Sequence, residues 1–306
     1  MDEKKRIFDA VKESEERYRR LVELSPDGII ITSEFRFLFM NPSGIRILAG
    51  ESVEEFLGKS VFDFVHCDHR RILAERFRKM QEKGESVPWM EVKFICQDGR
   101  EIDVEVASTP FTLDGKMAVQ SIFRDITERK LAEKHLEFLA NFDPLTGLPN
   151  RRLFFDRIGQ SLLNAKRQEH LVGLLYLDLD RFKEVNDSFG HAVGDLLLKE
   201  VSERLAQALR LSDSVARMGG DEFTVILTKI VEPDDAAIVA ERIVGSLSRP
   251  FMLDGHPVSI GVSIGIGIYP LDGEDPDTLL KKADTAMYRA KGAGSNLFRY
   301  YQRCPD

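Results

Sequence analysis

Hydrophobic and polar positions change period several times along the 306 residues of this chain. From Asp2 to Leu24, strong helix formers predominate and apolar residues recur at alternating spacings of four and three, which predicts a helix with a short coiled-coil seam. The seam positions are Ile7, Val11, Ser14, Tyr18 and Leu21. An amphipathic helix packed on its own domain would have a similar pattern, so both arrangements stay open.

Residues 28–124 show the alternation and the turn signals of short strands joined by short helices. Strands are expected over Gly28–Thr32, Phe35–Met40, Trp89–Gln97, Glu101–Phe111 and Met117–Arg124, and helices over 41–48 and Asp68–Lys83. Asp-Gly turns separate the last three strands, which favours an antiparallel meander. Two strands, small helices and a meander predict an α+β module of roughly a hundred residues.

Residues 21–127 resemble a PAS sensor domain. The resemblance is carried by Leu24-Ser25-Pro26-Asp27-Gly28-Ile29-Ile30, Asn41-Pro42, Asp98-Gly99 and the exit Arg124-Asp125-Ile126-Thr127-Glu128-Arg129-Lys130. It implies a module that senses a signal, binds a small ligand or mediates dimerisation, and the sequence does not identify the ligand. Cys67 lacks the surrounding motif of flavin-binding light sensors, and a polar loop explains His66 and His69 more simply than a haem or metal site does.

Charged residues return from Asp125 to Asn141, with Ile126, Leu131, Phe138 and Phe142 among helix formers, which predicts a connecting helix. By resemblance to other PAS-linked enzymes it would transmit a change from sensor to output, and a plain spacer is the alternative. The expected divisions are an N-terminal helix (1–20), a PAS domain (21–127), a helical linker (128–142) and a C-terminal domain (143–306).

The C-terminal half begins with the Pro/Gly-rich boundary Asp143–Arg152 and contains a continuous apolar run, Leu171–Leu177, typical of a buried central strand. Asp178-Leu179-Asp180 follows directly. Ionised carboxylates beside a core cost several kcal/mol unless a cation, a helix N-terminus or an arginine is near. A polar site is therefore expected where this strand ends, although a helix cap is the simpler explanation for Asp178 alone.

A second group of acids is expected at the tip of a β-hairpin. Val215–Met218 and Phe223–Leu227 have strand-forming residues, and Gly219-Gly220 between them permits a tight turn that presents Asp221 and Glu222. An exposed, solvated turn would explain these residues taken alone. A basic residue, an amide and another acid follow the central strand, and together with the hairpin they form a polar site: Lys183, Asn186 and Asp195.

At these positions residues 143–306 resemble a GGDEF-family diguanylate cyclase. The motifs are Asp178-Leu179-Asp180, Lys183, Asn186-Asp187, Gly190-His191, Gly194-Asp195 and Gly219-Gly220-Asp221-Glu222-Phe223. The resemblance implies a palm-like fold that makes cyclic di-GMP from two GTP. It further implies magnesium bound by Asp178, the Leu179 carbonyl, Asp221 and Glu222; phosphate contacts by Lys183 and Lys291; guanine contacts by Asn186 and Asp195; and close nucleotide approach at Gly219 and Gly220.

The chemistry accounts for these residue types. Attack of a 3′-hydroxyl on an α-phosphate concentrates negative charge that carboxylate-held divalent ions stabilise, and two Mg²⁺ per site are expected, with Mn²⁺ also possible. Lysines neutralise the leaving pyrophosphate, and an amide with a carboxylate matches the guanine edge. Because one half-site presents one GTP, activity should require a homodimer. By the same resemblance, Asp221, Glu222 and Lys183 would take the catalytic roles.

Arg210-Leu211-Ser212-Asp213 matches the family's inhibitory RxxD site in content and in its distance from Gly219, which implies product binding by Arg210 and Asp213. The helix Asp277–Lys291 carries Lys291, and Ser295 stands where many relatives have a phosphate-contacting arginine. Further helices are expected over 153–166, 196–209 and 233–247, and a strand over 258–268. Gly261-Val262-Ser263-Ile264-Gly265 matches a hydrolase nucleophile elbow, but β-forming residues continue after Ser263, so we interpret it as a decoy.

Composition and charge limit the kinds of molecule that the chain is expected to bind. The 51 acidic and 43 basic residues give a net charge of −8, which disfavours nonspecific binding to nucleic acid. Three scattered cysteines and the lack of a long apolar run indicate a cytoplasmic protein without a membrane span. The sequence therefore predicts an α+β chain in which a PAS sensor regulates a diguanylate cyclase. The alternative is a silent receptor that binds GTP or cyclic di-GMP without turnover.

Overall fold

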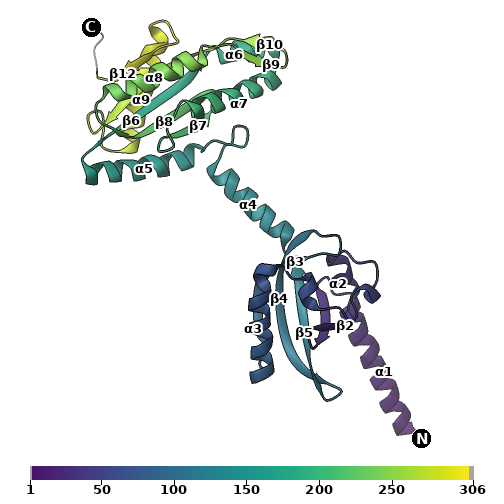
Figure 1. The fold of residues 1–306 in the computed structure, drawn as a ribbon. Helices are drawn as coiled ribbons and strands as arrows, with labels where there is room; N and C mark the ends of the chain where they lie inside the picture. Colours follow the sequence, from purple (N-terminus) through teal and green to yellow (C-terminus); the bar gives the residue numbers. More distant parts are fainter. Residues whose placement is uncertain (1, 303–306) are drawn as a thin grey trace. The chain divides into compact units, whose positions relative to one another are not determined.

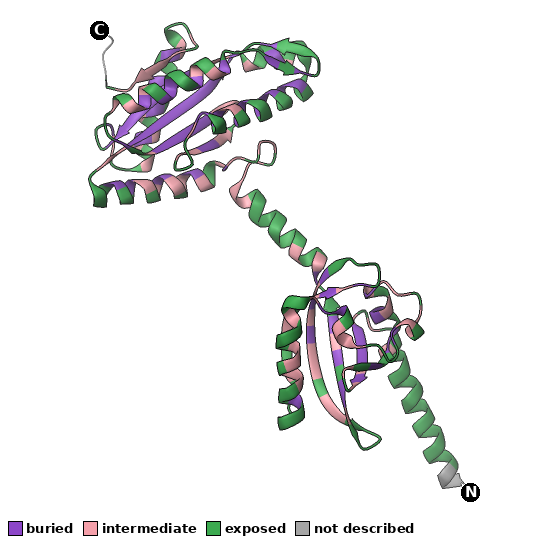
Figure 2. Ribbon diagram, viewed as in Figure 1, coloured by how far each residue is buried: buried purple, intermediate pink, exposed green. Residues whose placement is uncertain are grey.

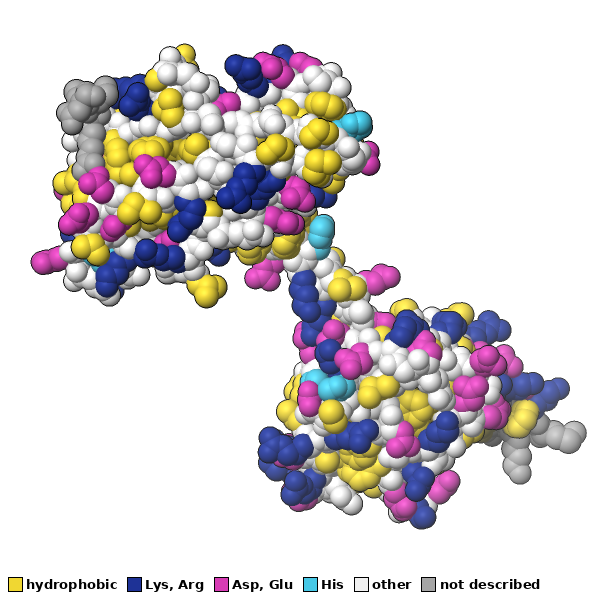
Figure 3. Space-filling model, turned by 45° about the horizontal axis from the view of Figure 1, so that its top comes forward, with side chains coloured by type: hydrophobic (Ala, Val, Ile, Leu, Met, Phe, Trp, Pro, Cys, Tyr) yellow, Lys and Arg dark blue, Asp and Glu magenta, His cyan; other side chains and the backbone are white. Residues whose placement is uncertain are grey.

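Residues 2–302 are described by the computed structural model, in which the chain forms two units, residues 1–134 and 135–306 (Figure 1). None of the helices within residues 2–302 combines the length and the hydropathy needed to cross a membrane. On the face that Figure 3 shows, acidic and basic side chains are intermixed over both units. The excess of acidic residues is therefore not gathered into one patch on that face.

The N-terminal unit is an α+β module around a five-stranded antiparallel sheet with the strand order β2-β1-β5-β4-β3. Its strands are β1 (Gly28–Ser33), β2 (Arg36–Met40), β3 (Val87–Ile95), β4 (Glu101–Leu113) and β5 (Lys116–Asp125). Its helices are α1 (Asp2–Glu23), α2 (Pro42–Ile47) and α3 (Cys67–Lys83), with 3-10 turns at Val53–Glu55 and Val61–Phe64. The expected order of two strands, small helices and a meander is confirmed.

Aromatic side chains form much of the core of this unit, and Figure 2 shows buried residues along its strands. The five largest contributors are at most 7% exposed: Phe37, Phe56, Phe64, Phe94 and Phe123. Asn41 of the Asn-Pro pair is fully buried; its Oδ1 accepts from the backbone of Ile29 and Gly44, and its amide donates to the carbonyls of Val22 and Asp27. That one side chain joins the end of α1, the start of β1 and the start of α2.

Helix α1 leaves its predicted seam uncovered. Ile7, Val11, Tyr18 and Leu21 are each at least 60% exposed, so the helix does not bury this face against its own unit. Of the two arrangements that the sequence left open, the described residues therefore do not show the one in which the seam packs on its own domain.

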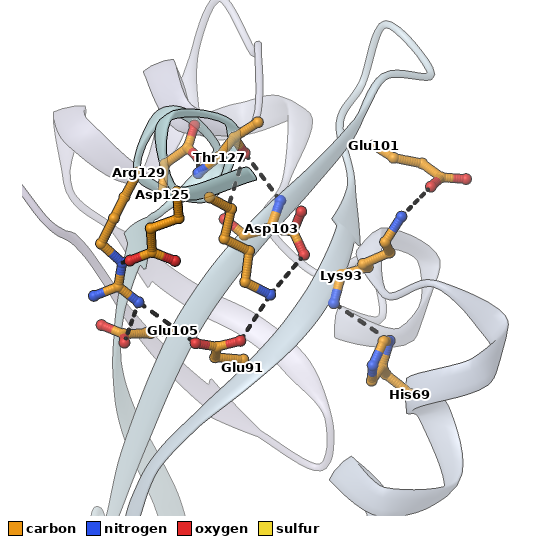
Figure 4. A network of polar contacts seen from close by, with 11 residues as sticks. His69, Glu91, Lys93, Glu101, Asp103, Glu105, Asp125, Thr127 and Arg129 are labelled. Carbon is orange, nitrogen blue, oxygen red and sulfur yellow. Dashed lines mark hydrogen bonds and ion pairs between the residues drawn. The ribbon is translucent and has the colours of Figure 1, made fainter. Parts of the chain in front are cut away.

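Helix α4 (Thr127–Asn141) leaves the sheet through a group of polar contacts, which Figure 4 shows. The hydroxyl of Thr127 accepts from the backbone N–H of Asp103 at 3.0 Å. Lys130 lies 2.7 Å from Glu91 and 3.2 Å from Asp103. Because these partners belong to β3 and β4, the first turn of α4 is attached to the sheet rather than loosely tethered.

The C-terminal unit is a second five-stranded sheet, with the order β12-β11-β6-β8-β7, antiparallel except where β11 and β12 run parallel. Its strands are β6 (Leu171–Asp180), β7 (Ser214–Gly219), β8 (Glu222–Ile230), β11 (Gly261–Tyr269) and β12 (Phe298–Tyr300), and β9 (Phe251–Leu253) and β10 (His256–Val258) form a separate hairpin. Its helices are α5 (Arg151–Gln168), α6 (Phe182–Phe189), α7 (His191–Gln207), α8 (Asp234–Leu247) and α9 (Pro276–Gly292). The mostly antiparallel central sheet flanked by helices is confirmed.

The structure corrects the expected elements after the central strand. Residues 182–189 form helix α6, which the sequence did not predict, and α7 begins at His191 rather than at 196. Gly190, with φ +84°, ends α6 and starts α7. Gly194 lies buried inside α7, where a Cβ would be 1.9 Å from Asn186 Oδ1. Glycine is present there for close packing, which a single sequence does not distinguish from a turn.

Candidate active site

The central strand β6 places Asp178 between two neighbouring strands. Asp178 is 7% exposed. In the strand register it lies opposite Glu222 of β8 on one side and opposite Ser263 of β11 on the other. Directly opposed residues of antiparallel strands point to the same face, with Cβ atoms about 4.5–5.5 Å apart. The structure therefore brings the first acid of the strand and the second acid of the hairpin together across one pair of strands.

The hairpin tip has a backbone that only glycine adopts easily. Gly219 and Gly220 have φ angles of +144° and +55°, and a Cβ at either would meet no atom within 4 Å. Conformation rather than crowding thus requires glycine, and the space beside the turn stays open to a ligand. The backbone N–H of Leu179 donates to the carbonyl of Asp221 at 3.2 Å, which attaches the tip to β6.

Asp178 carries its charge in an unfavourable place. Burial raises the pKa of its carboxyl above the ordinary value, Asp221 and Glu222 raise it further, and Lys291 opposes them. The Lys291 ammonium of α9 lies 2.6 Å from Oδ1 of Asp178. That oxygen is buried and accepts no well-aligned hydrogen bond from residues 2–302. It is therefore an acceptor that a stronger cation can take.

These donors suit a hard divalent ion, which prefers carboxylate and carbonyl oxygens. In the described residues, however, the carboxylate oxygens of Asp178, Asp221 and Glu222 do not all lie within 4.8 Å of one another. The three carboxylates would have to come closer together to share one ion. Asp178, Asp221 and Glu222 would hold such an ion, which would compete with Lys291 for the Asp178 carboxylate. Lys291 would then be free to meet phosphate, as the sequence predicted for it.

Tyr176, two residues before Asp178, was expected only as part of the apolar strand. Its hydroxyl donates to Oε2 of Glu222 at 3.1 Å, and burial and the Glu222 charge both raise the pKa of this phenol. Because the phenol stays protonated, it remains a donor that orients Glu222. A tyrosine at an inward position of a central strand was the only sequence signal for this contact.

Arg217 is a second residue that the sequence did not single out. It donates two hydrogen bonds to the carbonyl of Gly220, at 3.0 and 2.8 Å, and one to Asp143 at 2.9 Å. Although burial acts to raise the pKa of the Asp143 carboxyl, its contacts with Thr146 and Arg217 lower it below the ordinary value. Arg217 thus connects the hairpin to the start of the domain, which explains why an acid opens the boundary Asp143–Arg152.

Three of the four residues predicted to contact guanine and phosphate lie on α6 and α7, while Lys291 lies on α9. Lys183 is exposed on α6, Asn186 is half-buried on the same helix, and Asp195 is exposed in the first turns of α7. The buried Gly194 leaves room for Asn186 Oδ1 beside α7. Two packed helices therefore carry the amide and the carboxylate that the sequence grouped.

The RxxD residues occupy the turn before β7, at the opposite end of that strand from Gly219. The backbone N–H of Arg210 faces Asp213 at 3.4 Å, and the Arg210 side chain is exposed. Six residues of β7 separate the two ends, a span of roughly 17 Å. A ligand on Arg210 and Asp213 is thus distant from the hairpin tip within one subunit.

Ser263 has a structural contact that accounts for its burial. It is fully buried in β11, which continues as a strand to Tyr269, and its hydroxyl donates to Asp180 Oδ1 at 2.7 Å. The backbone N–H of Asn296 donates to the other oxygen of Asp180 at 2.8 Å. No strand-to-helix turn follows the serine, so the hydrolase motif is a decoy, as the sequence suggested. Ser295, next to Asn296, has the left-handed φ of +62°.

Comparison with known families assigns both units. The model of the PAS fold matches residues 16–126, and the model of the diguanylate cyclase GGDEF domain matches residues 140–297. The chain therefore belongs to the GGDEF family of diguanylate cyclases and carries a PAS domain before its GGDEF domain. GGDEF domains that act as diguanylate cyclases generally use divalent metal ions, which agrees with the oxygen donors at Asp178.

Among its relatives, the diguanylate cyclase TpbB of Pseudomonas aeruginosa is 44% identical over 153 residues, which make up 50% of this chain and 35% of TpbB. The signaling protein YkoW of Bacillus subtilis is 32% identical over 298 residues, 96% of this chain and 36% of YkoW. This chain thus spans little more than a third of the length of either relative. The crystal structure of the TpbB GGDEF domain matches with a TM-score of 0.51 and 41% identity, covering 52% of this chain and 99% of that domain.

Proposed function

We propose that this chain is a diguanylate cyclase that condenses two GTP molecules into cyclic di-GMP and releases two pyrophosphates. The observation that carries the proposal is the buried Asp178 opposite Glu222, next to an open glycine turn. A receptor that only binds nucleotides does not need an ionised acid in its core. A buried charge destabilises the fold unless a cation pairs with it.

In the proposed reaction, Asp178, Asp221, Glu222 and the Leu179 carbonyl hold two Mg²⁺ ions, with Mn²⁺ as a possible substitute. Such ions stabilise the charge on the α-phosphate and lower the pKa of the attacking 3′-hydroxyl. Tyr176 keeps Glu222 oriented, and Arg217 keeps the turn in the shape that leaves its backbone accessible.

Binding of GTP is proposed to use separate groups for its two ends. Lys183 and the displaced Lys291 neutralise the phosphates, while Asn186 and Asp195 match the acceptor and donors of the guanine edge. Gly219 and Gly220 admit the nucleotide to the turn. Adenine is disfavoured because its edge would leave Asn186 and Asp195 without matching partners.

Each GGDEF domain presents one GTP, so two copies must face each other, and we propose a homodimer as the active form. The uncovered seam of α1 and the helix α4 are the segments through which the PAS domain would control this encounter. Arg210 and Asp213 are proposed to bind the product and to inhibit further turnover.

The test incubates the full chain with GTP and Mg²⁺ and separates the nucleotides by chromatography. Asp221→Ala should abolish the dinucleotide product, whereas Glu203→Gln, which changes an exposed acid on α7, should leave it unchanged. A dimeric wild-type preparation that binds GTP but yields no cyclic dinucleotide would instead identify a nucleotide receptor.

A further inference from the structure

The PAS domain contains a cavity of about 80 Å³ between α3 and the buried face of its sheet. Its wall is aliphatic and aromatic except at a few positions, and apolar side chains such as Phe37 and Phe123 make up most of it. The polar side chains are Thr32, Arg76, Ser108 and Ser121. A cavity this apolar selects a ligand with an apolar body, and its polar groups select the headgroup.

Arg76 is a cation without an anion. It projects from α3 and donates a hydrogen bond to the backbone carbonyl of Pro88 at the start of β3. Within residues 2–302, no carboxylate pairs with it, and neither Asp nor Glu lines the cavity. Burial lowers the pKa of its guanidinium. Four N–H donors of the fork stay available for an acceptor.

The hydroxyl groups of the wall add further donors. Ser108 and Ser121 face each other across β4 and β5, and their oxygens are 2.8 Å apart. In such a pair one hydroxyl donates and the other keeps its own proton available to a third group. Thr32 is 4% exposed, and its side chain lines the same cavity. Its hydroxyl can serve as one more donor to an acceptor of the ligand.

We propose that this cavity binds a small aliphatic monocarboxylate, whose carboxylate meets Arg76 and whose tail fills the apolar interior. The size limits the tail, because a dry cavity of about 150 Å³ accommodates benzene and this one is about half as large. By that ratio the cavity takes a tail of about three or four carbons. Haem and flavin are too large, and neither His nor Cys lines the cavity within the described residues.

One guanidinium also limits the charge of the ligand. A monocarboxylate leaves no charge unpaired, whereas the second carboxylate of a diacid would be buried among apolar side chains without a partner. An alcohol of the same length keeps the tail contacts and loses the charge-assisted hydrogen bonds. Comparison of acid, diacid and alcohol therefore separates recognition of the headgroup from burial of the tail.

The test is isothermal titration calorimetry of the full chain with valerate, without nucleotide, so its outcome does not depend on the proposed cyclase activity. Saturable binding at one site per chain is expected, and glutarate and 1-pentanol should each bind about tenfold more weakly or worse. Equal binding of valerate and 1-pentanol, or no saturable binding of valerate, would overturn the proposal.

Two variants on the same helix locate the site. Arg76→Gln should weaken valerate binding by about tenfold or more, while Arg78→Gln, at an exposed position two residues further along α3, should leave it unchanged. A thermal midpoint for each variant establishes that it is folded. If Arg76→Gln does not fold, Ser121→Ala takes its place and is expected to weaken valerate binding. A folded variant of either kind that binds valerate as tightly as the wild type would contradict the assignment.

Discussion

The substitution Gly194→Ala tests how the fold positions the amide that we propose recognises guanine. A Cβ at residue 194 would lie 1.9 Å from Asn186 Oδ1 and 3.0 Å from its Cγ, which non-bonded atoms cannot tolerate. Because the clash involves the end of a side chain and not the backbone, Asn186 should rotate away while the two helices stay packed. Alanine also favours a helix interior over glycine by about 1 kcal/mol, so the fold should keep its stability.

The rotation removes the Asn186 contact with guanine. A hydrogen bond of this kind contributes about 1–3 kcal/mol when its partner is left unsatisfied, which corresponds to a loss of about 5- to 150-fold in kcat/KM for GTP. Steady-state kinetics of cyclic di-GMP formation measure this loss. A thermal midpoint no lower than that of the wild type would show that the loss arises at the site and not from unfolding.

Gly159→Ala is the matched control, since Gly159 lies in helix α5 and a Cβ there would meet no atom within 4 Å. It should keep wild-type kinetics and gain a little stability. If Gly194→Ala retained the wild-type kcat/KM, the reasoning that places Asn186 on the guanine edge through this glycine would be refuted.

Three further substitutions test the charges of the site. Asp178→Asn should abolish turnover yet raise the thermal midpoint at neutral pH. The pKa of Asp178 is raised in the folded chain, so its ionised form opposes folding above that pKa. A thermal midpoint lower than that of the wild type would contradict this. Arg217→Ala should destabilise the chain by about 2–3 kcal/mol in urea denaturation. Because the pKa of Asp143 is lowered, its contribution to the free energy of unfolding should be present at neutral pH and be lost in acid as the pH falls through that pKa. If the destabilisation caused by Arg217→Ala did not shrink in acid, that would count against the Asp143 contact. Arg210→Ala should relieve inhibition by added cyclic di-GMP without lowering the initial rate, and unchanged inhibition would remove Arg210 from the product site.

Much of the fold was predictable because its strands have strong local signals. The apolar run of β6, the glycine turn before β8 and the Asp-Gly turns of the PAS meander each specify their element within a few residues. Helix α6 was missed because residues 181–195 contain Asn, Asp, Ser and Gly, which favour turns when considered one by one. The packing of Asn186 against Gly194 favours a helix at these residues, and the periodicity of the sequence carries no information about such contacts.

The site was predictable in its residue types more than in its contacts. Motif order grouped Asp178, Glu222 and Asn186, but the Lys291 ammonium on Asp178 joins residues more than a hundred positions apart, and no local pattern signals that contact. The same holds for Arg217, whose side chain joins the hairpin to Asp143. Contacts between distant segments depend on the three-dimensional arrangement, whereas the motifs describe only neighbours in sequence.

The most direct measurement of the central claim is the stoichiometry of turnover. The 306-residue chain is incubated with GTP and Mg²⁺, and cyclic di-GMP is quantified by mass spectrometry alongside released pyrophosphate. The account predicts two pyrophosphates for every cyclic di-GMP, with neither product formed by Asp178→Asn. Release of pyrophosphate without the cyclic dinucleotide, or no consumption of GTP by the dimeric wild type, would contradict it.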